Sequence, residues 1–383
     1  MLKVLIFVPA HTDSVDIHHE LTTRLAQCLS GEVEVRLATS SDKNVSQAVT
    51  DYDIVHIFGC WSNSACLLAN KAYRHRVPYI VTPLGGLQPW EMEHHRHTLL
   101  LQRQKNLVEK ASAVHVCGKL EQETFAKVGW NKRVCQIKNP VLTSLATFDD
   151  TTRDLLALYR KALDSNARLL LRKDERRLIG RLLQAGIDDQ AVKADDGSLA
   201  KDLAGLSEEA WRHILIYVAD EKIDTPVKDA LGRLGVEYPQ IDVAAVDRFD
   251  NASPYPDGHL RDDTLLSRNI LTRNNVKDVF SDNGREERRV CLALLNLHYE
   301  LGRKAAPLLH LADLYSLLRF SDFDEDSVKS MAHGLNVDEF AERLMAIMAD
   351  FLGLTEGFMP FTARNDRRAR KLKRMITKFG VYK

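Results

Sequence analysis

The stretch VPYIVTPLGGLQPW, residues 77–90, places a short strand directly before a loop that contains a pair of glycines. Residues 77–82 are rich in β-branched and aromatic side chains, which predicts a buried strand ending at Thr82. The proline and glycines that follow predict a loop. Gly85 and Gly86 serve either a turn that needs positive φ or a close approach of the backbone to a ligand.

Further strands of the same kind flank this stretch, and helical segments separate most of them. The predicted strands are 2–9, 32–39, 53–59, 77–82, 112–118 and 133–140, and the predicted helices among them are 16–30, 63–75, 91–111 and 119–129. Such an alternation predicts a parallel sheet covered by helices on both faces. The fold class is therefore predicted to be α/β, with a doubly wound parallel-sheet, Rossmann-like domain of about six strands.

The remainder of the chain has a different pattern, in which charged residues alternate with Leu and Ile at helical spacing. A mostly α-helical region is therefore expected after the first domain. The predicted boundaries are 1–145 for the Rossmann-like domain, 146–250 for a helical region, 251–265 for a loop or linker, and 266–383 for a helical region with a basic C-terminal tail. Two prolines and a glycine mark the linker.

Composition limits the class of protein. Lys and Arg together number 53, as do Asp and Glu, so the chain of 383 residues is neutral overall. It contains no apolar run long enough to span a bilayer, and its first strand follows Met1 without a signal-peptide pattern. The six cysteines form neither a C-x-x-C motif nor a regular framework. These features predict a protein of a reducing cytoplasm.

The segment 364–378 carries eight basic side chains and one acidic side chain, Asp366. It is either a solvated terminal helix or a segment attracted to an anionic membrane surface. In the second case Met375, Ile376 and Phe379 would supply a small apolar face beside the charges. Nucleic acid is disfavoured as the partner, because the rest of the chain is neutral and shows no recognised nucleic-acid module.

Ligands of doubly wound domains bind outside the carboxyl ends of the strands. Four loops at such ends carry polar or aromatic residues, and they read VPAHTDSVDIHH, HIFGCWSNS, TPLGGLQPW and CGKLEQE. A helix follows each loop, and its free N–H groups favour an anion. Trp61 and Trp90 are either core residues or an apolar wall for a sugar ring. His56 lies inside an apolar strand and is expected to be a hydrogen-bonded core histidine.

Known catalytic motifs are absent. The sequence has no Walker loop, no G-x-S-x-G and no zinc pattern, and the lack of G-x-G-x-x-G argues against a nicotinamide enzyme. His94 and His97 are predicted to share a helix face near His95, but no carboxylate or Cys cluster completes a metal site. No metal site is therefore predicted, and the catalytic residues stay unknown.

The segments DIVHIFGCW, VPYIVTPLGGLQPW, KNLVEKASAVHVCGKLEQE and IKNPV occur in this order. Together they resemble the N-terminal half of GT-B glycosyltransferases, and most closely the large retaining group of family 4, which builds bacterial surface polysaccharides. The resemblance covers residues 1–145. It implies that this domain holds the acceptor and that a cleft between two domains holds the sugar nucleotide. The substrate-binding residues that it implies are Gly59, Trp61, Thr82, Gly85, Gly86, Trp90, Lys105 and Glu121.

The sequence departs from this family in several places. Leu84 stands where the family has a histidine, and His11 is the polar candidate in a first loop that lacks the usual glycine pair. Beyond residue 150 no Glu-x7-Glu pair and no second Rossmann-like domain are visible. The diphosphate of a donor needs cations, a metal or N–H groups. Either the basic residues of 172–177 supply them, or a partner transferase chain completes the cleft, or catalysis has been lost.

The resemblance implies transfer of a sugar from a nucleotide sugar to a saccharide or lipid-linked acceptor in bacterial surface polysaccharide synthesis. The nucleotide sugar is a co-substrate, and no other cofactor is expected. The protein is expected in the cytoplasm, or peripherally at the inner membrane face. The alternative is a catalytically inactive relative that binds a glycan or a partner. A third hypothesis, based on the basic tail, is a regulatory or nucleic-acid-associated protein.

Overall fold

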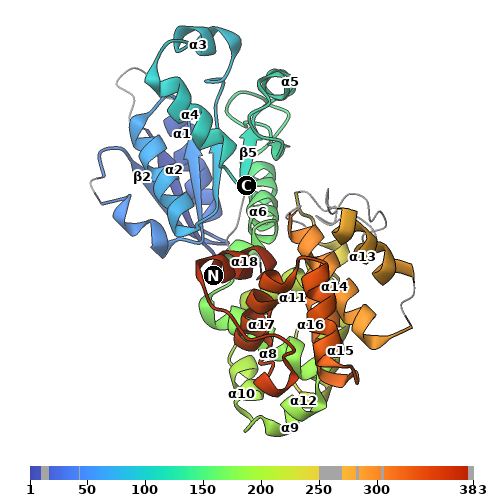
Figure 1. Ribbon diagram of the computed structural model, residues 1–383. Coiled ribbons are helices and arrows are strands. Elements are labelled where there is room, and N and C mark those ends of the chain that lie inside the picture. The colour runs from blue at the N-terminus through green and yellow to red at the C-terminus, as the bar shows by residue number, and fades with distance from the viewer. Residues whose placement is uncertain (10–16, 43, 250–269, 282–283, 303–305, 378–383) are drawn as a thin grey trace. The chain divides into compact units, whose positions relative to one another are not determined.

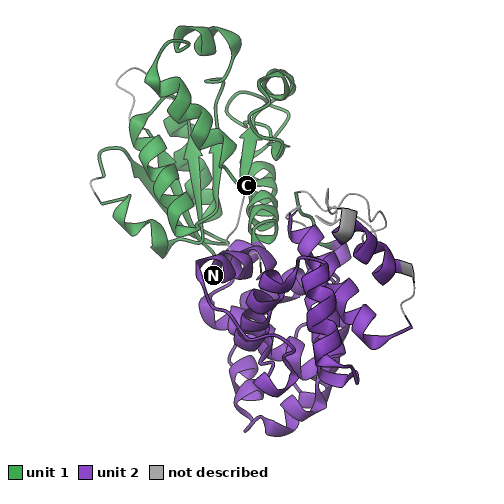
Figure 2. Ribbon diagram, viewed as in Figure 1, with its two compact units in different colours: residues 1–166, 246–251 green, residues 167–245, 252–383 purple. Residues whose placement is uncertain are grey.

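The computed structural model describes residues 1–383 except 10–16, 43, 250–269, 282–283, 303–305 and 378–383. The chain forms two compact units, shown in Figure 2. Unit 1 comprises residues 1–166 and 246–251, and unit 2 comprises residues 167–245 and 252–383. The linker predicted at 251–265 lies outside the described residues.

Unit 1 is built on one six-stranded sheet with the strand order β2-β1-β3-β4-β5-β6 (Figure 1). The strands are β1 (Lys3–Val8), β2 (Glu34–Thr39), β3 (Ile54–Phe58), β4 (Tyr79–Thr82), β5 (Ala113–Val116) and β6 (Val134–Gln136). All neighbouring pairs are parallel. This arrangement confirms the predicted α/β parallel-sheet class, and it brings the carboxyl ends of all six strands to one edge.

Two apolar cores lie on opposite faces of this sheet. Side chains of β1 alternate between them, so that Val4 and Ile6 belong to one core and Leu5 and Phe7 to the other. The first core contains residues of α1 (Ile17–Leu29) and α6 (Phe148–Asp164), and the second contains residues of α2 (Asn63–His75), α4 (Leu99–Glu109) and α5 (Lys119–Val128). Burial on both faces explains why the strands are apolar almost throughout.

Unit 1 extends past residue 145, because α6 completes its first core. Leu155 and Tyr159 of α6 are fully buried in that core. The short segment 246–251 also belongs to the unit, where the backbone N–H of Phe249 donates to Ser165 Oγ at 2.8 Å. Part of the region predicted at 146–250 thus packs on the sheet.

The prediction of a single helix at 91–111 is wrong. The structure has two helices there, α3 (Pro89–His94) and α4 (Leu99–Glu109). Thr98 caps α4 with its side chain, and its hydroxyl donates to the carbonyl of His95 at 2.8 Å, so the chain turns between the helices. His97 lies in this turn and does not share a helix face with His94.

Unit 2 is helical throughout its described residues, in agreement with the predicted helical region. Its helices are α7 (Ala167–Leu170), α8 (Lys173–Ile187), α9 (Asp189–Ala194), α10 (Ser198–Ala204), α11 (Glu208–Asp220), α12 (Asp224–Leu234), α13 (Ile270–Ser281), α14 (Glu286–Gly302), α15 (Leu308–Phe320), α16 (Glu325–Gly334), α17 (Asp338–Leu352) and α18 (Arg367–Thr377), with short 3₁₀ turns at Val243–Ala245 and Glu356–Phe358. None of the described helices of the chain is long and apolar enough to cross a membrane.

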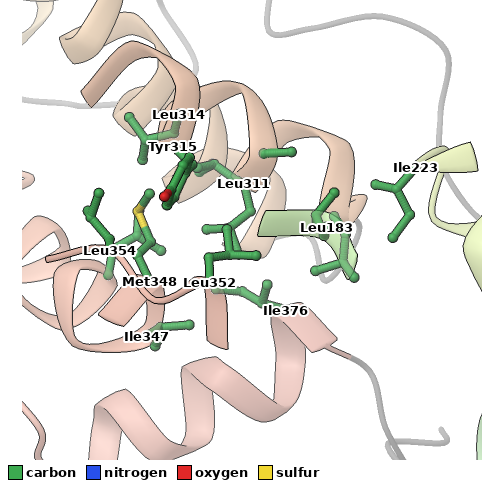
Figure 3. Close-up of a cluster of buried hydrophobic side chains, with 14 of the residues drawn as sticks. Leu183, Ile223, Leu311, Leu314, Tyr315, Ile347, Met348, Leu352, Leu354 and Ile376 are labelled. Carbon is green, nitrogen blue, oxygen red and sulfur yellow. The ribbon is translucent and has the colours of Figure 1, made fainter. Parts of the chain in front are cut away.

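One apolar core holds these helices together, and Figure 3 shows part of it. Helices α8 and α12 approach each other closely at Gly186, where an added Cβ would lie 1.9 Å from the carbonyl oxygen of Pro226. Only a residue without a side chain fits between these backbones. At the C-terminal end of the described chain, Ile376 of α18 points into the same core beside Leu352 (Figure 3).

Candidate functional site

The candidate site lies at the carboxyl ends of β3, β4 and β5, where three loops are joined by hydrogen bonds. The loop after β3 begins at Gly59, whose φ is +87°, and the backbone N–H of Gly59 donates to the carbonyl of Thr82 at 2.8 Å. In the loop after β4, both Leu84 (φ 52°) and Gly85 (φ 80°) adopt left-handed conformations. Two neighbouring loops therefore turn sharply at the edge where ligands of this fold class bind.

Glu121 joins the loop after β4 to the loop after β5. One carboxylate oxygen accepts the backbone N–H of Gly85 at 2.8 Å, and the other accepts the backbone N–H of Cys117 at 2.6 Å. The side chain also lies in the first turn of α5, where the helix dipole favours a negative charge. Glu121 thus fixes the glycine loop against the start of α5.

Trp61 joins the loop after β3 to the loop after β4 and to α4. Its ring N–H donates to the carbonyl of Gly86 at 2.6 Å, and its backbone N–H donates to the side chain of Gln104 at 2.9 Å. One face of the indole stacks on His95, with ring centroids 4.1 Å apart. Gly86 is needed here, because a Cβ would lie 2.8 Å from Cβ of Cys60.

A pocket of about 350 Å³ opens beside Gly85 and Glu121. Its lining residues are His18, Leu84, Gly85, Gln88, Cys117, Gly118, Leu120, Glu121, Asn139, Leu142 and Thr143. Leu120 and Leu142 leave 73% and 65% of their surface exposed, which makes the rim apolar. None of the described residues that line the pocket is a Lys or an Arg. It therefore suits a neutral group with apolar and hydroxyl surfaces better than a diphosphate.

A chain of hydrogen bonds runs beneath these loops through fully buried side chains. His115 Nε2 bonds to the carbonyl of Ile137 at 3.0 Å, and His115 Nδ1 to the hydroxyl of Thr82 at 2.8 Å. The same hydroxyl bonds to His56 Nε2 at 2.7 Å, and His56 Nδ1 bonds to the hydroxyl of Tyr159 at 2.9 Å.

The direction of this chain follows from its last acceptor. A carbonyl oxygen only accepts, so His115 Nε2 carries a proton and His115 Nδ1 accepts from Thr82. The Thr82 oxygen then accepts from His56 Nε2, and Tyr159 donates to His56 Nδ1. Every member is satisfied when both imidazoles are neutral.

Burial keeps both imidazoles neutral. It lowers the pKa of His115 to about 4, although the hydrogen bond to the carbonyl of Ile137 opposes this shift. Burial also lowers the pKa of His56 well below its usual range, and the neighbouring His115 adds to the effect. The hydrogen-bond chain therefore stabilises the ends of β3, β4 and β5 only in its uncharged form.

The cysteines at the site are not activated. Burial, with the charge of Glu121 as a second cause, raises the pKa of the Cys117 thiol to about 12. Burial raises the pKa of Cys60 as well. A thiolate is the nucleophilic form of cysteine, so both residues are expected to act as small apolar groups at neutral pH.

The structure brings together six of the eight predicted substrate-binding residues. Hydrogen bonds link Gly59 to Thr82, Gly85 to Glu121, and Trp61 to Gly86. Of these residues, only Gly85 and Glu121 line the pocket, and the Thr82 side chain is fully buried. The role of all six in substrate binding stays a prediction.

Trp90 and Lys105 lie apart from this network. Trp90 is 69% exposed on α3 and does not line the pocket. Lys105 lies on α4 and forms an ion pair with Glu109 at 3.7 Å. His11 lies outside the described residues. Among the residues that the structure does describe, no group of three His, Cys, Asp or Glu side chains is arranged to hold a metal ion.

Two of the four basic residues of 172–177 form local contacts. Arg172 forms an ion pair with Glu175 at 2.6 Å in a capping arrangement at the start of α8. The Nε atom of Arg176 donates to the carbonyl of Leu171 at 2.8 Å. These contacts occupy the side chains of Arg172 and Arg176, which weakens the candidacy of these two residues as a donor clamp.

Sequence reasoning missed several residues of the site. Gln104 is fully buried and holds Trp61, and its position between Leu100 and Leu107 on an apolar helix face was a visible signal. Leu120 and Leu142 on the pocket rim carried no such signal. The partnership of His56 with Tyr159 was also hidden, because the two residues lie 103 positions apart in the sequence.

Residues 19–140 match the family model of the glycosyl transferase 4-like domain. The matched region contains β2 to β6 and the three loops described above. The match supports an N-terminal domain like that of GT-B family 4 enzymes, and glycosyl transfer as the general class of activity. No curated protein and no solved structure matches the chain.

Proposed function

We propose that the protein is a glycosyltransferase that moves a sugar from a nucleotide-sugar donor to a saccharide or lipid-linked acceptor, with retention, in bacterial surface polysaccharide synthesis. The observation that carries this proposal is the match of residues 19–140 to a glycosyl transferase 4-like domain. The pocket at the strand ends supports it, since ligands of doubly wound domains bind at that edge.

We assign the acceptor to the pocket beside Glu121. Its apolar rim and its amide and hydroxyl groups, from Gln88, Asn139 and Thr143, match the mixed surface of a sugar or of a sugar joined to a lipid. Both carboxylate oxygens of Glu121 accept hydrogen bonds from backbone N–H groups. It therefore acts as a positioning residue that holds the loop of Gly85 in shape.

The diphosphate of the donor needs partners from elsewhere, because neither Lys nor Arg is found among the lining residues that the structure describes. We infer that they come from residues outside this pocket or from a partner transferase chain. A nucleotide sugar would be the only co-substrate. The six cysteines are free thiols, which supports a place in the reducing cytoplasm.

A transfer assay with a matched pair of variants tests this proposal. The protein is incubated with UDP-, GDP- and dTDP-sugars and with saccharide and lipid-linked acceptors, and free nucleotide is measured with and without acceptor. Leu142→Trp would fill the pocket rim, so KM for the acceptor is expected to rise about tenfold or more while donor hydrolysis without acceptor is unchanged.

Leu67→Trp is the control, since Leu67 is 68% exposed on α2 and does not line the pocket. If the two substitutions raise KM for the acceptor equally, the assignment of the acceptor to this pocket is wrong. A lack of both transfer and hydrolysis with every nucleotide sugar would contradict the proposed activity.

The second candidate function is that of a catalytically inactive relative that binds a glycan or a partner protein. It is favoured by the helical unit 2, whose described residues contain no strand, and by the absence of a Glu-x7-Glu pair beyond residue 150. Calorimetry separates the two candidates. Glycan binding without any nucleotide binding would favour the inactive relative, whereas nucleotide binding would favour the transferase.

A further inference from the structure

Helix α18 presents four cationic side chains on one exposed face. With about 100° of rotation per residue, Arg367, Arg370, Lys371 and Arg374 fall within an arc of about 100°. All four side chains are exposed. Three of them are arginines, whose planar guanidinium groups bind phosphate oxygens in pairs.

The opposite face of α18 is fixed to unit 2. Ala369 and Ile376 are buried, and Ile376 points into the apolar core (Figure 3). Leu372 and Met375 pack against the same core, and the hydroxyl of Tyr217 donates to the carbonyl of Thr377. The apolar side chains of α18 therefore pack against the core of unit 2, and the face that α18 exposes to solvent is the charged one.

Three other basic residues of this segment have acidic partners. Lys373 forms an ion pair with Asp350, Arg364 with Asp366 at 3.2 Å, and Arg368 approaches Glu339 at 4.0 Å. Within the part of the chain that the structure describes, no ion pair is found for the four side chains of the exposed face.

This arrangement costs stability in the absence of a ligand. Four pairs among the exposed cations are three or four residues apart on the helix, a spacing at which like charges repel. Arg367 also lies in the first turn of α18, where the helix dipole disfavours a positive charge. A solvated face would be more stable with acidic residues among the basic ones, so the retained repulsion indicates an anionic partner.

We propose that the exposed face of α18 docks the protein on an anionic phospholipid bilayer by electrostatic attraction, without insertion of the helix. Arg367, Arg370, Lys373 and Arg374 line one open hollow of about 520 Å³. An open cationic face cannot enclose a small ion, but it fits a flat layer of phosphate groups. This inference does not depend on glycosyl transfer.

The exposed side chains favour a bilayer over nucleic acid. Recognition of nucleic acid combines phosphate contacts with stacking or with contacts to base edges. The exposed residues of α18 are all Arg or Lys and include neither aromatic nor amide side chains. The chain as a whole is neutral, so its net charge gives no general attraction to nucleic acid.

Co-sedimentation of the full chain with vesicles tests the proposal. The protein should bind vesicles that contain phosphatidylglycerol, should fail to bind vesicles of phosphatidylcholine alone, and should be released by high salt. The triple variant Arg367→Gln, Arg370→Gln and Arg374→Gln should bind the anionic vesicles about 100-fold more weakly, since each basic residue near such a surface contributes about fivefold. Its melting temperature should not fall, because the substitutions remove repulsion.

The control variant removes the same number of charges from other helices of unit 2, as Lys193→Gln, Lys201→Gln and Lys228→Gln. These lysines are exposed on α9, α10 and α12, and vesicle binding should change less than threefold. Equal loss in both variants, or equal binding to both kinds of vesicle, would overturn the proposal. Tighter binding to duplex DNA, or full competition by inorganic diphosphate at matched phosphate concentration, would assign the face to a different anion and overturn it as well.

Discussion

The two units bury polar groups in different ways. Beneath the candidate site of unit 1, four neutral side chains form one directed chain, in which Thr82 lies between His56 and His115. In unit 2, buried carboxylates form ion pairs that join helix to helix. Glu221, fully buried, pairs with Arg168 at 2.9 Å and accepts the backbone N–H of Leu308 at 3.1 Å, and Asp188 pairs with Arg319 at 2.9 Å.

Buried polar groups therefore have a different structural role in each unit. The chain in unit 1 lies beneath the loops of the candidate site and holds three strand ends in a fixed register, so it is part of what shapes the site. The ion pairs in unit 2 join its helices at defined points. A neutral histidine network and a set of buried ion pairs should also respond differently to acid.

The largest expected effect is the loss of stability of unit 1 in acid. The pKa of His115 is about 4 in the folded protein and about 6.5 in the unfolded chain. The unfolded chain therefore takes up the proton first as the pH falls. The stability contributed by the neutral ring is complete above about pH 6.5 and is lost progressively toward pH 4, by about 3 kcal/mol for His115, and His56 adds to the loss in the same direction.

Denaturant unfolding monitored between pH 7 and pH 5 measures this effect in a range where carboxylates are still ionised. The NMR signals of His56 and His115 should stay those of neutral rings over this range. Titration of either buried ring near pH 6.5 in the folded protein would contradict the assignment of a neutral chain.

The next effect tests helix packing in unit 2. Gly186→Ala is expected to lower the free energy of unfolding by about 2–3 kcal/mol, because the new Cβ would lie 1.9 Å from the carbonyl oxygen of Pro226. The control is Gly232→Ala on α12, where no atom lies within 4 Å of the new Cβ. That substitution should stabilise the protein by up to about 1 kcal/mol. A harmless Gly186→Ala variant would show that α8 and α12 are not in close contact.

Most of the fold of unit 1 was predictable from the sequence. β-Branched runs of strand length, separated by helices, indicate a parallel sheet, and the six strands lie where the pattern places them. The break between α3 and α4 was missed, because the cap at Thr98 is a local contact inside a segment with otherwise helical spacing. In unit 2 the helices were predictable, but their packing depends on close approaches such as that at Gly186.

The candidate site was predictable in its location and not in its contacts. Parallel strands fix one edge, so the loops of Trp61, Gly85 and Glu121 had to meet there. The use of Glu121 to bind two backbone N–H groups, and the link from His56 to Tyr159, arise from tertiary contacts that leave no local pattern. The sequence suggested that Glu121 and Trp61 contact the substrate. In the structure, the polar groups of their side chains form hydrogen bonds with the protein backbone.

The smallest of the three effects concerns the two hydrogen bonds that the Glu121 side chain accepts. Glu121→Ala removes the acceptor of two backbone N–H groups, those of Gly85 and Cys117, and should lower the free energy of unfolding by about 2 kcal/mol. Glu123→Ala is the control, because Glu123 is more exposed and has only a 3.9 Å ion pair with Lys119, so its loss should cost less than about 0.5 kcal/mol. Equal stabilities of the two variants in denaturant unfolding would leave Glu121 free to contact a ligand directly. A clear difference would show that its carboxylate is committed to the loop, and that the shape of the pocket depends on it.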